Sequence, residues 1–248
     1  MTIGVLFLLG VAFVSCFVCE HKSQSGESED LYRHFWSEPA PFTNGQFVEI
    51  GGYDGVTFSN SWFFEKCLNW RGVLVEGHPV LYRKMQKNRP SAVNLNMAVC
   101  SQRKLINYTL NASPVSGAVE FMPESFKSHW RSLLRVDNTI EVFCGPLGHQ
   151  LCLLGIVNID FFSLDVEGAE WQVLQTLDFN LLNVHVLLVE ADRHDTEKNE
   201  RVRRYMTESQ GFILNQSLVA RSDVFVNPSY EKRRGLMHPS PCISIIQK

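Results

Sequence analysis

The sequence has almost no excess of charge of either sign. Its 248 residues include 23 Lys and Arg against 26 Asp and Glu, which gives a formal net charge of −3. A chain with this balance creates no positive field over its whole surface, and such a field is what draws proteins to nucleic acid. We therefore predict no nucleic-acid partner.

The sequence also lacks a recognisable cysteine framework and a metal-binding pattern. Five cysteines follow the first 19 residues, and this odd number, spread from Cys67 to Cys242, leaves room for one disulfide without assigning it. His149 lies between Cys144 and Cys152, but this spacing matches no zinc site. We predict no resident metal ion.

A long apolar run, in contrast, opens the chain. The 17 residues 3–19 carry no charge, and Glu20, His21 and Lys22 follow at once. This length suits both a short membrane anchor and a signal peptide. No Lys or Arg precedes the run and no small-residue cleavage site follows it, so an uncleaved anchor is slightly favoured. A buried helix of the folded domain is the alternative.

Three glycosylation tripeptides agree with export of the rest of the chain. Asn107, Asn111 and Asn215 each begin an Asn-x-Ser/Thr sequence, which is the acceptor pattern for N-glycosylation in secreted proteins. Such tripeptides also arise by chance. We predict a membrane-anchored or secreted protein whose globular part lies in the secretory lumen or outside the cell.

The chain is predicted to form a signal anchor or signal peptide over residues 1–19, a polar stem or linker over 20–41 and one domain over 42–248. Apolar runs alternate with amphipathic runs in that domain, which predicts an α/β fold with a mostly parallel sheet and helices on both faces. Expected strands span 46–50, 72–75, 92–99, 159–164, 184–189, 212–218, 224–226 and 243–246, and expected helices span 59–68, 79–87, 169–177 and 197–210. Turn-forming residues between 105 and 121 indicate an inserted hairpin or loop.

The first candidate site is a glycine-rich turn after the strand expected at 46–50. It reads Phe47-Val-Glu-Ile-Gly-Gly-Tyr-Asp-Gly55, so Glu49, Gly51 and Gly55 have the spacing Glu-x-Gly-x-x-x-Gly. Glycines at such a turn allow positive φ and let a ligand approach the main chain. A purely structural tight turn gives the same pattern.

A second acid makes the ligand more specific. Glu76 ends the next strand, 21 residues after Gly55, and an acid at about this position binds ribose hydroxyls in Rossmann-type sites. The glycines at 51, 52 and 55 do not form the G-x-G-x-x-G turn of dinucleotide enzymes. The combination therefore favours S-adenosylmethionine over NAD and weighs against a nicotinamide-dependent oxidoreductase.

Three blocks of the sequence resemble the FkbM family of methyltransferases, over roughly residues 45–195. They are residues 47–60, 70–79 and 159–170, and the last contains Asp165-Val-Glu-Gly168, the family's most specific signature. The resemblance implies a Rossmann-like class I methyltransferase fold with S-adenosylmethionine as cofactor. It also implies O-methylation of a hydroxyl, often on a sugar or a natural product.

The resemblance further implies a cofactor site at the carboxyl ends of four strands. The glycine turn would contact the methionine end, Glu76 would bind the ribose, and the end of the third strand would border the adenine. From the methionine end to the adenine end, the implied residues are Glu49, Gly51, Gly55, Glu76, Gly77, His78, Asn96 and Ala98, with Asp165 closing the site.

Methyl transfer to a hydroxyl is helped by a base that takes the proton. Asp165, Glu167, Glu190 and Asp192 fall at the ends of neighbouring predicted strands, and we predict Asp165 and Glu190 as the catalytic residues. In the alternative, Glu167 caps the following helix and Glu190 is a solvated strand end. Clustered acids can also hold a divalent ion, but no His or Asn is spaced to complete such a set.

Two functions therefore stand against each other. The leading one is an S-adenosylmethionine-dependent methyltransferase that acts on a small molecule or glycan and is tied to the membrane by its N-terminal segment. The alternative is a non-catalytic, membrane-anchored binding or trafficking protein with the same fold, as in Star-like proteins. The presence of Glu49, Gly51, Gly55, Glu76 and Asp165 favours the enzyme. The sequence gives no indication of the oligomeric state.

Overall fold

The structure, a computed structural model, describes residues 19–134, 136–191, 193 and 195–230. The apolar run before Cys19 and the strand expected at 243–246 lie outside these residues. In the described part of the chain, no helix is both long enough and apolar enough to cross a membrane. The assignment of residues 1–19 as a signal segment therefore stays a prediction.

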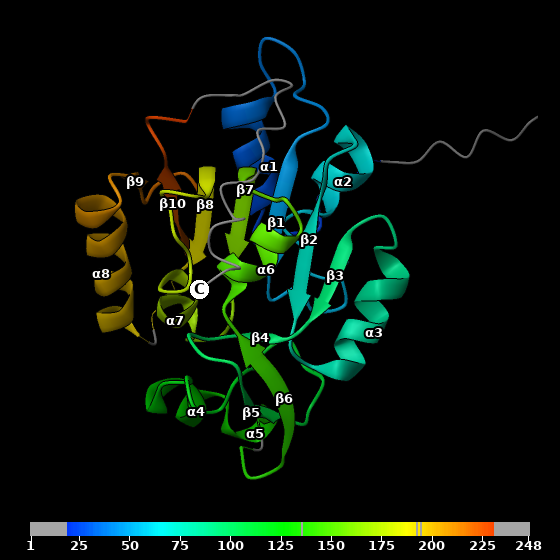
Figure 1. The fold of residues 1–248 in the computed structure, drawn as a ribbon, viewed down its shortest axis with the longest axis vertical. Helices are drawn as coiled ribbons and strands as arrows, with labels where there is room; N and C mark the ends of the chain where they lie inside the picture. Colours follow the sequence, from blue (N-terminus) through cyan, green and yellow to red (C-terminus); the bar gives the residue numbers. More distant parts are fainter. Residues whose placement is uncertain (1–18, 135, 192, 194, 231–248) are drawn as a thin grey trace, which may run out of the picture.

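Within the described residues, a seven-stranded sheet forms the centre of the molecule, in the order β3-β2-β1-β7-β8-β10-β9 (Figure 1). The first five strands in this order are parallel, and β10 is antiparallel to both of its neighbours. The strands are β1 (Gln46–Ile50), β2 (Arg71–Glu76), β3 (Val93–Asn96), β7 (Asn158–Leu164), β8 (Asn183–Glu190), β9 (Ile213–Asn215) and β10 (Ser222–Val226). The predicted α/β fold with a mostly parallel sheet is confirmed.

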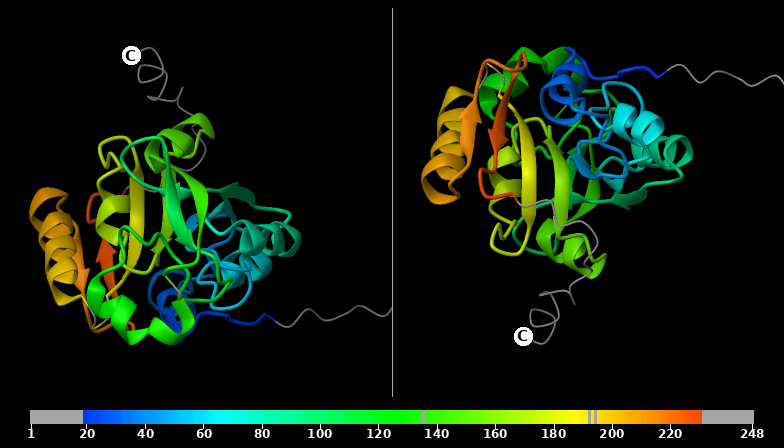
Figure 2. Two further views of the ribbon diagram at one scale, coloured as in Figure 1. Left: turned by 90° about the horizontal axis from the view of Figure 1, so that it is seen from below. Right: turned by 90° about the horizontal axis from the view of Figure 1, so that it is seen from above.

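Alternate side chains of the central strands enter two separate cores. Val48 and Phe162 pack on one face, with α6 (Leu147–Leu153), α7 (Glu170–Leu174), α8 (Thr196–Arg204) and the π-helix η2 (Tyr205–Ser209). Phe47 and Phe161 pack on the other, with α1 (Glu27–Leu31), the π-helix η1 (Tyr32–Trp36), α2 (Trp62–Leu68) and α3 (Pro79–Asn88). Figure 2 shows helices on both sides of the central strands. Burial on both faces explains why these strand sequences are mostly apolar and do not alternate with polar residues.

Part of the segment expected to be a polar stem is folded onto the domain. Leu31 and Trp36 are buried in the second core, where the Trp36 ring packs edge-on against Phe64 of α2. A disulfide also joins Cys19 to Cys67 of α2. The linker prediction is therefore wrong for residues 27–36, because apolar side chains spaced among the polar ones bury against α2.

Residues 98–145 form a smaller unit beyond the carboxyl ends of the central strands (Figure 1). Its sheet has the order β4-β6-β5. Its elements are β4 (Ala98–Val99), β5 (Lys104–Thr109), α4 (Glu124–His129), α5 (Arg131–Leu134) and β6 (Thr139–Gly145). We call residues 98–145 the insert.

The insert is larger than the hairpin or loop expected at 105–121. Strand β5 pairs with β6, about thirty residues further along. Within 105–121 the chain also turns back on β5 through a bridge between Tyr108 and Ala118 and two neighbouring backbone hydrogen bonds. The strand expected over 92–99 is wrong, because it divides between β3 of the central sheet and β4 of the insert. At the division, the Asn96 side chain bonds to the main chain after β2.

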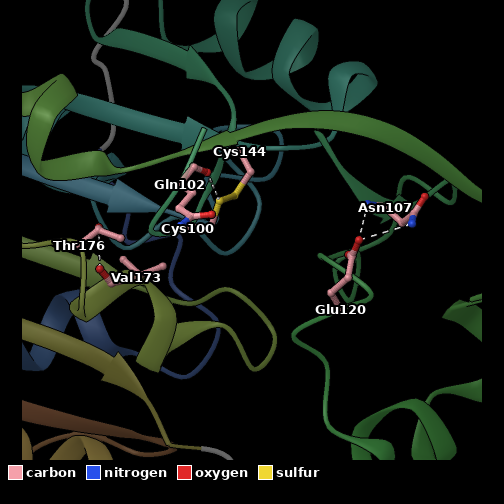
Figure 3. The surroundings of a disulfide bond; sticks show 7 residues. All are labelled: Cys100, Gln102, Asn107, Glu120, Cys144, Val173 and Thr176. Carbon is pink, nitrogen blue, oxygen red and sulfur yellow. Dashed lines mark hydrogen bonds between the residues drawn. A yellow bond between two sulfur atoms is a disulfide. The ribbon is translucent and has the colours of Figure 1, made fainter. Parts of the chain in front are cut away.

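A disulfide closes the base of the insert. Cys100 follows β4 and is bonded to Cys144 of β6 (Figure 3). With the bridge from Cys19, this gives two disulfides among the described residues, where the sequence left room for one. The expectation of one disulfide came from counting only the five cysteines that follow residue 19. Cys19 belongs to the folded domain, so the count from that residue on is six, an even number.

Gly51 is needed for the close approach of β1 to the end of β7. Its φ is 86°, and a Cβ there would lie 1.7 Å from the carbonyl oxygen of Asp165. We expect Gly51→Ala to lower the free energy of unfolding by about 4 kcal/mol, the upper end for point substitutions. Gly155 also has a positive φ, 71°, but has open space around it. Gly155→Ala should therefore lose only about 1–2 kcal/mol. Urea unfolding measures both, and equal losses would contradict the prediction.

Candidate active site

A cavity of about 800 Å³ opens at the carboxyl ends of the central strands. It is lined by Ile50 and Gly51 at the end of β1 and by Leu164 and Asp165 at the end of β7. The strand order reverses between β1 and β7, and ligands of open α/β sheets bind at such a point. The volume lies in the usual range for a small-molecule site.

Glu49 lines this cavity, but its carboxylate is held by the chain itself. One oxygen accepts hydrogen bonds from the hydroxyls of Ser59 and Ser61, at 2.8 and 2.5 Å. The other oxygen accepts the backbone N–H of Asn60 at 2.8 Å. These bonds keep residues 59–61 out of the helix expected at 59–68, so α2 begins only at Trp62. A contact between Glu49 and the cofactor stays a prediction.

The same two serines also bind a fully buried cation, Arg89, at the C-cap of α3. Its guanidinium donates to the hydroxyls of Ser59 and Ser61, at 3.1 and 2.9 Å, and to the carbonyl of Gly55 at 3.0 Å. It is also paired with Glu65 at 2.6 Å. Ser59 and Ser61 thus lie between a buried anion and a buried cation.

Gly55 is not brought to the cavity, although it was predicted to contact the cofactor. Its φ is 81°, and a Cβ there would lie 2.8 Å from Cγ of Arg89. Among the described residues, neither cavity has Gly55 in its lining. The glycine is needed because the chain passes directly over the buried Arg89 side chain.

Glu76 lies at the end of β2 with only 4% of its surface exposed. One carboxylate oxygen accepts the N–H of Tyr53 at 2.9 Å, and the other accepts the N–H of His78 at 2.7 Å. Each oxygen retains acceptor capacity for a ligand hydroxyl. Burial raises the pKa of Glu76 to about 7, against the lowering effect of the two N–H groups. This carboxyl therefore changes charge near neutral pH.

Two predicted cofactor-binding residues, His78 beside the ribose and Asn96 beside the adenine, do not line either cavity among the described residues. His78 caps α3, because its Nδ1 accepts the N–H of Val80 at 3.2 Å, and its Nε2 bonds to the Leu110 carbonyl at 2.9 Å. The Asn96 amide donates to the carbonyls of residues 76 and 77, at 2.8 and 3.0 Å. Both side chains are therefore bound to the main chain.

Gly77 and Ala98, in contrast, line a second cavity of only about 30 Å³. Tyr108 of the insert lines both cavities, and its ring lies so close to Gly77 that a Cβ there would be 2.6 Å away. A volume of this size holds about one water molecule. A purine could enter at this position only if the Tyr108 ring moved.

Asp165 and Glu190 meet at the neighbouring ends of β7 and β8. Carboxylate oxygens of these two residues and of Glu170 lie within 4.8 Å of one another. Burial raises the pKa of Asp165 to about 6 and that of Glu190 well above its usual value, the latter also because of the Asp165 charge. Both carboxyls therefore bind a proton more tightly than isolated acids do, and the hydrogen bond between them favours the proton on Glu190.

Glu170 and Lys198 complete this cluster, and neither was predicted as a site residue. The Lys198 ammonium lies 2.6 Å from one Glu170 oxygen and 3.4 Å from the carbonyl oxygen of Glu190. The other Glu170 oxygen accepts the N–H groups of Val166 and Gly168, at 3.0 and 3.3 Å. Asp192, another predicted acid, lies outside the described residues.

Segments far apart in the sequence line the rest of the cavity. The N-terminal segment contributes Gln24 and Glu27, the insert contributes Trp130 and Leu133, and the start of β10 contributes Arg221. The Arg221 guanidinium lies 3.8 Å from Glu190. No sequence pattern relates these residues, so their meeting could not be predicted from spacing.

Residues 49–214 match the family model described as "Methyltransferase FkbM domain". No curated protein matches the chain. Among solved structures, the human methyltransferase 10 domain containing protein is 10% identical, with 81% of this chain and 78% of that chain covered and a TM-score of 0.40. Aeropyrum pernix fibrillarin, solved with natively bound S-adenosyl-L-methionine, is 10% identical, with coverages of 75% and 66% and a TM-score of 0.35.

The buried pair of Arg89 and Glu65 yields a test of the loop that it supports. We expect Arg89→Met to lower the free energy of unfolding by about 3–5 kcal/mol, because it removes the buried cation of Glu65 and leaves only the more exposed Lys66 beside that carboxylate. The control is Arg201→Met, because the partner of Arg201, Glu197, is 87% exposed. That change should lose less than about 1 kcal/mol. Chemical denaturation measures both, and similar losses would contradict a special role for Arg89.

Proposed function

The chain belongs to the FkbM methyltransferase family, with S-adenosylmethionine as its cofactor, and on this premise we propose that it methylates a hydroxyl of a small molecule or glycan. The main support is the arrangement of one cavity. Glu76 lies on its cofactor side, and the Asp165–Glu190 pair lies where the ends of β7 and β8 meet. A carboxylate that can take a proton is thus near a group that can hold a ribose.

The residues on the cofactor side fit S-adenosylmethionine. Glu76 is held by two N–H groups and keeps one further acceptor position on each oxygen, so it can accept both ribose hydroxyls. The main chain at Gly51 borders the cavity without a side chain between it and a ligand. When bound, S-adenosylmethionine supplies an electrophilic methyl group, so the protein must mainly align the acceptor.

Asp165 is the proposed base. Its carboxylate lines the cavity and is ionised near neutral pH, so it can accept the proton of an acceptor hydroxyl. Glu190 lines the same cavity, and burial beside Asp165 raises its pKa, which favours its protonated form. It thereby limits the repulsion that a second full negative charge would place beside Asp165.

The lining of the cavity supports a neutral acceptor. Acids outnumber bases there, since Glu27, Glu167 and the catalytic pair face only Arg193 and Arg221. An anionic acceptor would therefore meet net repulsion. The half-buried Trp130 ring adds an apolar surface on which one face of a sugar or another ring can lie.

One observation favours the non-catalytic alternative, a binding protein with the same fold. The cavity beside Gly77 and Ala98 is only about 30 Å³, with Tyr108 against it. A protein that had lost its cofactor would have no need of a larger space there. Direct binding of the cofactor decides between the two.

We expect S-adenosylmethionine to bind the full chain, with an affinity that falls as the pH drops from 7.5 to 5.5. The ribose hydroxyls prefer the ionised Glu76 carboxylate, whose pKa in the free protein is about 7. Below that pH, binding must displace a proton, at a cost of up to about tenfold in affinity per pH unit. Isothermal titration calorimetry across this range measures the slope.

Glu76→Gln should weaken binding and flatten this slope, since an amide does not titrate. Glu197→Gln is the matched control, because that acid is on α8, does not line either cavity and is 87% exposed. It should leave both the affinity and the slope unchanged. Absence of binding heat from the unmodified chain would exclude the enzyme and favour the Star-like alternative.

We also propose that the folded part lies in the secretory lumen or outside the cell, anchored or secreted through its N-terminal segment. The two disulfides support an oxidising compartment. Asn107 is exposed on β5, where a glycan can be accommodated. Its backbone N–H bonds to Glu120 (Figure 3).

We expect enzymatic removal of N-glycans to increase the gel mobility of the protein made in animal cells. Asn107→Gln should reduce this change in mobility. The control is Asn180→Gln, because Asn180 does not begin an Asn-x-Ser/Thr sequence, and it should leave the change in mobility as it is. The domain should also resist protease in intact microsomes. Digestion without detergent would overturn the proposed localisation.

A further inference from the structure

We propose that Lys198 is a positioning residue for the proposed base: through Glu170 it supports the turn that carries Asp165, and its ammonium sets the charge of the Asp165–Glu190 pair. Lys198 lines neither cavity among the described residues, so it acts on the ligands only through these acids. The catalytic meaning of this inference rests on the proposed function, whereas its structural part does not.

The turn after β7 needs support from outside its own backbone. Glu167 and Gly168 have consecutive positive φ angles of 57° and 104°, a conformation that is unfavourable for a glutamate. The fully buried Glu170 carboxylate bonds to the N–H groups on either side of Glu167, at 3.0 and 3.3 Å. One oxygen of Glu170 therefore holds the chain immediately after Asp165.

Lys198 compensates the charge of Glu170. Its ammonium lies 2.6 Å from the second Glu170 oxygen, and the two side chains are 6% and 0% exposed. Asp195 caps the start of α8 by accepting the backbone N–H of Lys198 at 2.9 Å. The lysine thus extends from a fixed helix end into the acid cluster, and a buried charge of this kind is stable only when it is paired.

Glu190 and the charged groups that surround the pair come from five segments of the chain. Glu167 lies in the turn after β7, Glu170 on α7, Glu190 on β8, Lys198 on α8 and Arg221 before β10. Lys198 and Arg221 lower the pKa of Asp165, while Glu170 raises it. Arg221 is half exposed and thus screened by water, so the buried Lys198 is the stronger of the two cations at Asp165.

The experiment follows the Asp165 carboxyl by carbon-13 NMR in full chain labelled at aspartate Cγ, with Asp165→Asn used to assign its signal. In the unmodified protein this signal should titrate near pH 6, since the pKa of Asp165 is about 6. Lys198→Met should move the midpoint upward by about one pH unit, a tenfold change in proton affinity. Glu170→Gln should move it downward, because it removes a negative charge and leaves the ammonium in place.

Two further variants make the result specific. Lys198→Arg keeps the charge and should restore the midpoint to within a few tenths of a unit. Lys127→Met removes an ammonium paired with Glu124, which is 89% exposed, and should change nothing. Unfolding would return Asp165 to the ordinary pKa of an aspartate, which is a downward shift. The upward shift from Lys198→Met therefore cannot arise from unfolding, and the dispersion of the proton spectrum must show that Glu170→Gln is folded before its downward shift counts.

The proposal is overturned if Lys198→Met leaves the Asp165 midpoint unchanged or if Glu170→Gln raises it. If Lys198→Met does not fold, the other two variants decide: Lys198→Arg must keep the midpoint and Glu170→Gln must lower it. Calorimetry with S-adenosylmethionine separates this result from the proposed function. Lys198→Met should bind the cofactor within about threefold of the unmodified chain, whereas a failed methyltransferase assignment abolishes binding in both.

Discussion

The loop between β1 and α2 depends on two buried charges that protein groups alone neutralise. Glu49 and Arg89 are both shielded from water, and an isolated buried charge is costly unless every polar atom finds a partner. Their partners overlap at Ser59 and Ser61. A conformation that satisfies one charge thus also satisfies the other, which leaves little freedom to the chain between β1 and α2.

This constraint extends to the ligand side of the loop. The N–H of Tyr53 is held against Glu76 on the next strand, while Arg89 binds the carbonyl of Gly55 two residues further on. The loop is thereby fixed before any ligand arrives. Preorganisation of this kind reduces the entropy that binding must overcome. The carboxylate most important for the loop, Glu49, is thus distinct from the one best placed for a ribose.

The central sheet could be predicted because its signals are local. The runs that became β1, β2, β7 and β8 are mostly apolar on both faces, as burial on both faces of a parallel sheet requires. Strand β6 was not predicted. Its residues alternate between buried and exposed, and the helices of the insert separate it in sequence from its partner strand β5. The N-terminal segment was predicted as a linker because its buried apolar residues, among them Leu31 and Trp36, are outnumbered by polar neighbours.

In the site, too, the residues with a local sequence signal could be predicted and the others could not. Glu76, Asp165 and Glu190 could be placed together because each ends a strand, and parallel strands end at one edge. Gly55, His78 and Asn96 share the favourable sequence positions, but the chain uses them for its own packing and capping. Lys198, Tyr108 and Arg221 come from outside the parallel strands, so only the tertiary structure relates them to the acids.

The bridge between Cys100 and Cys144 has a consequence for how such a protein diversifies. It ties the two ends of the insert together next to the central sheet, so the intervening residues can change in length or sequence without displacing the strands. Those residues include Trp130 and Leu133 of the cavity wall. Selection can therefore reshape the surface that an acceptor meets while the ribose-binding side stays intact, which separates the evolution of specificity from that of the shared chemistry.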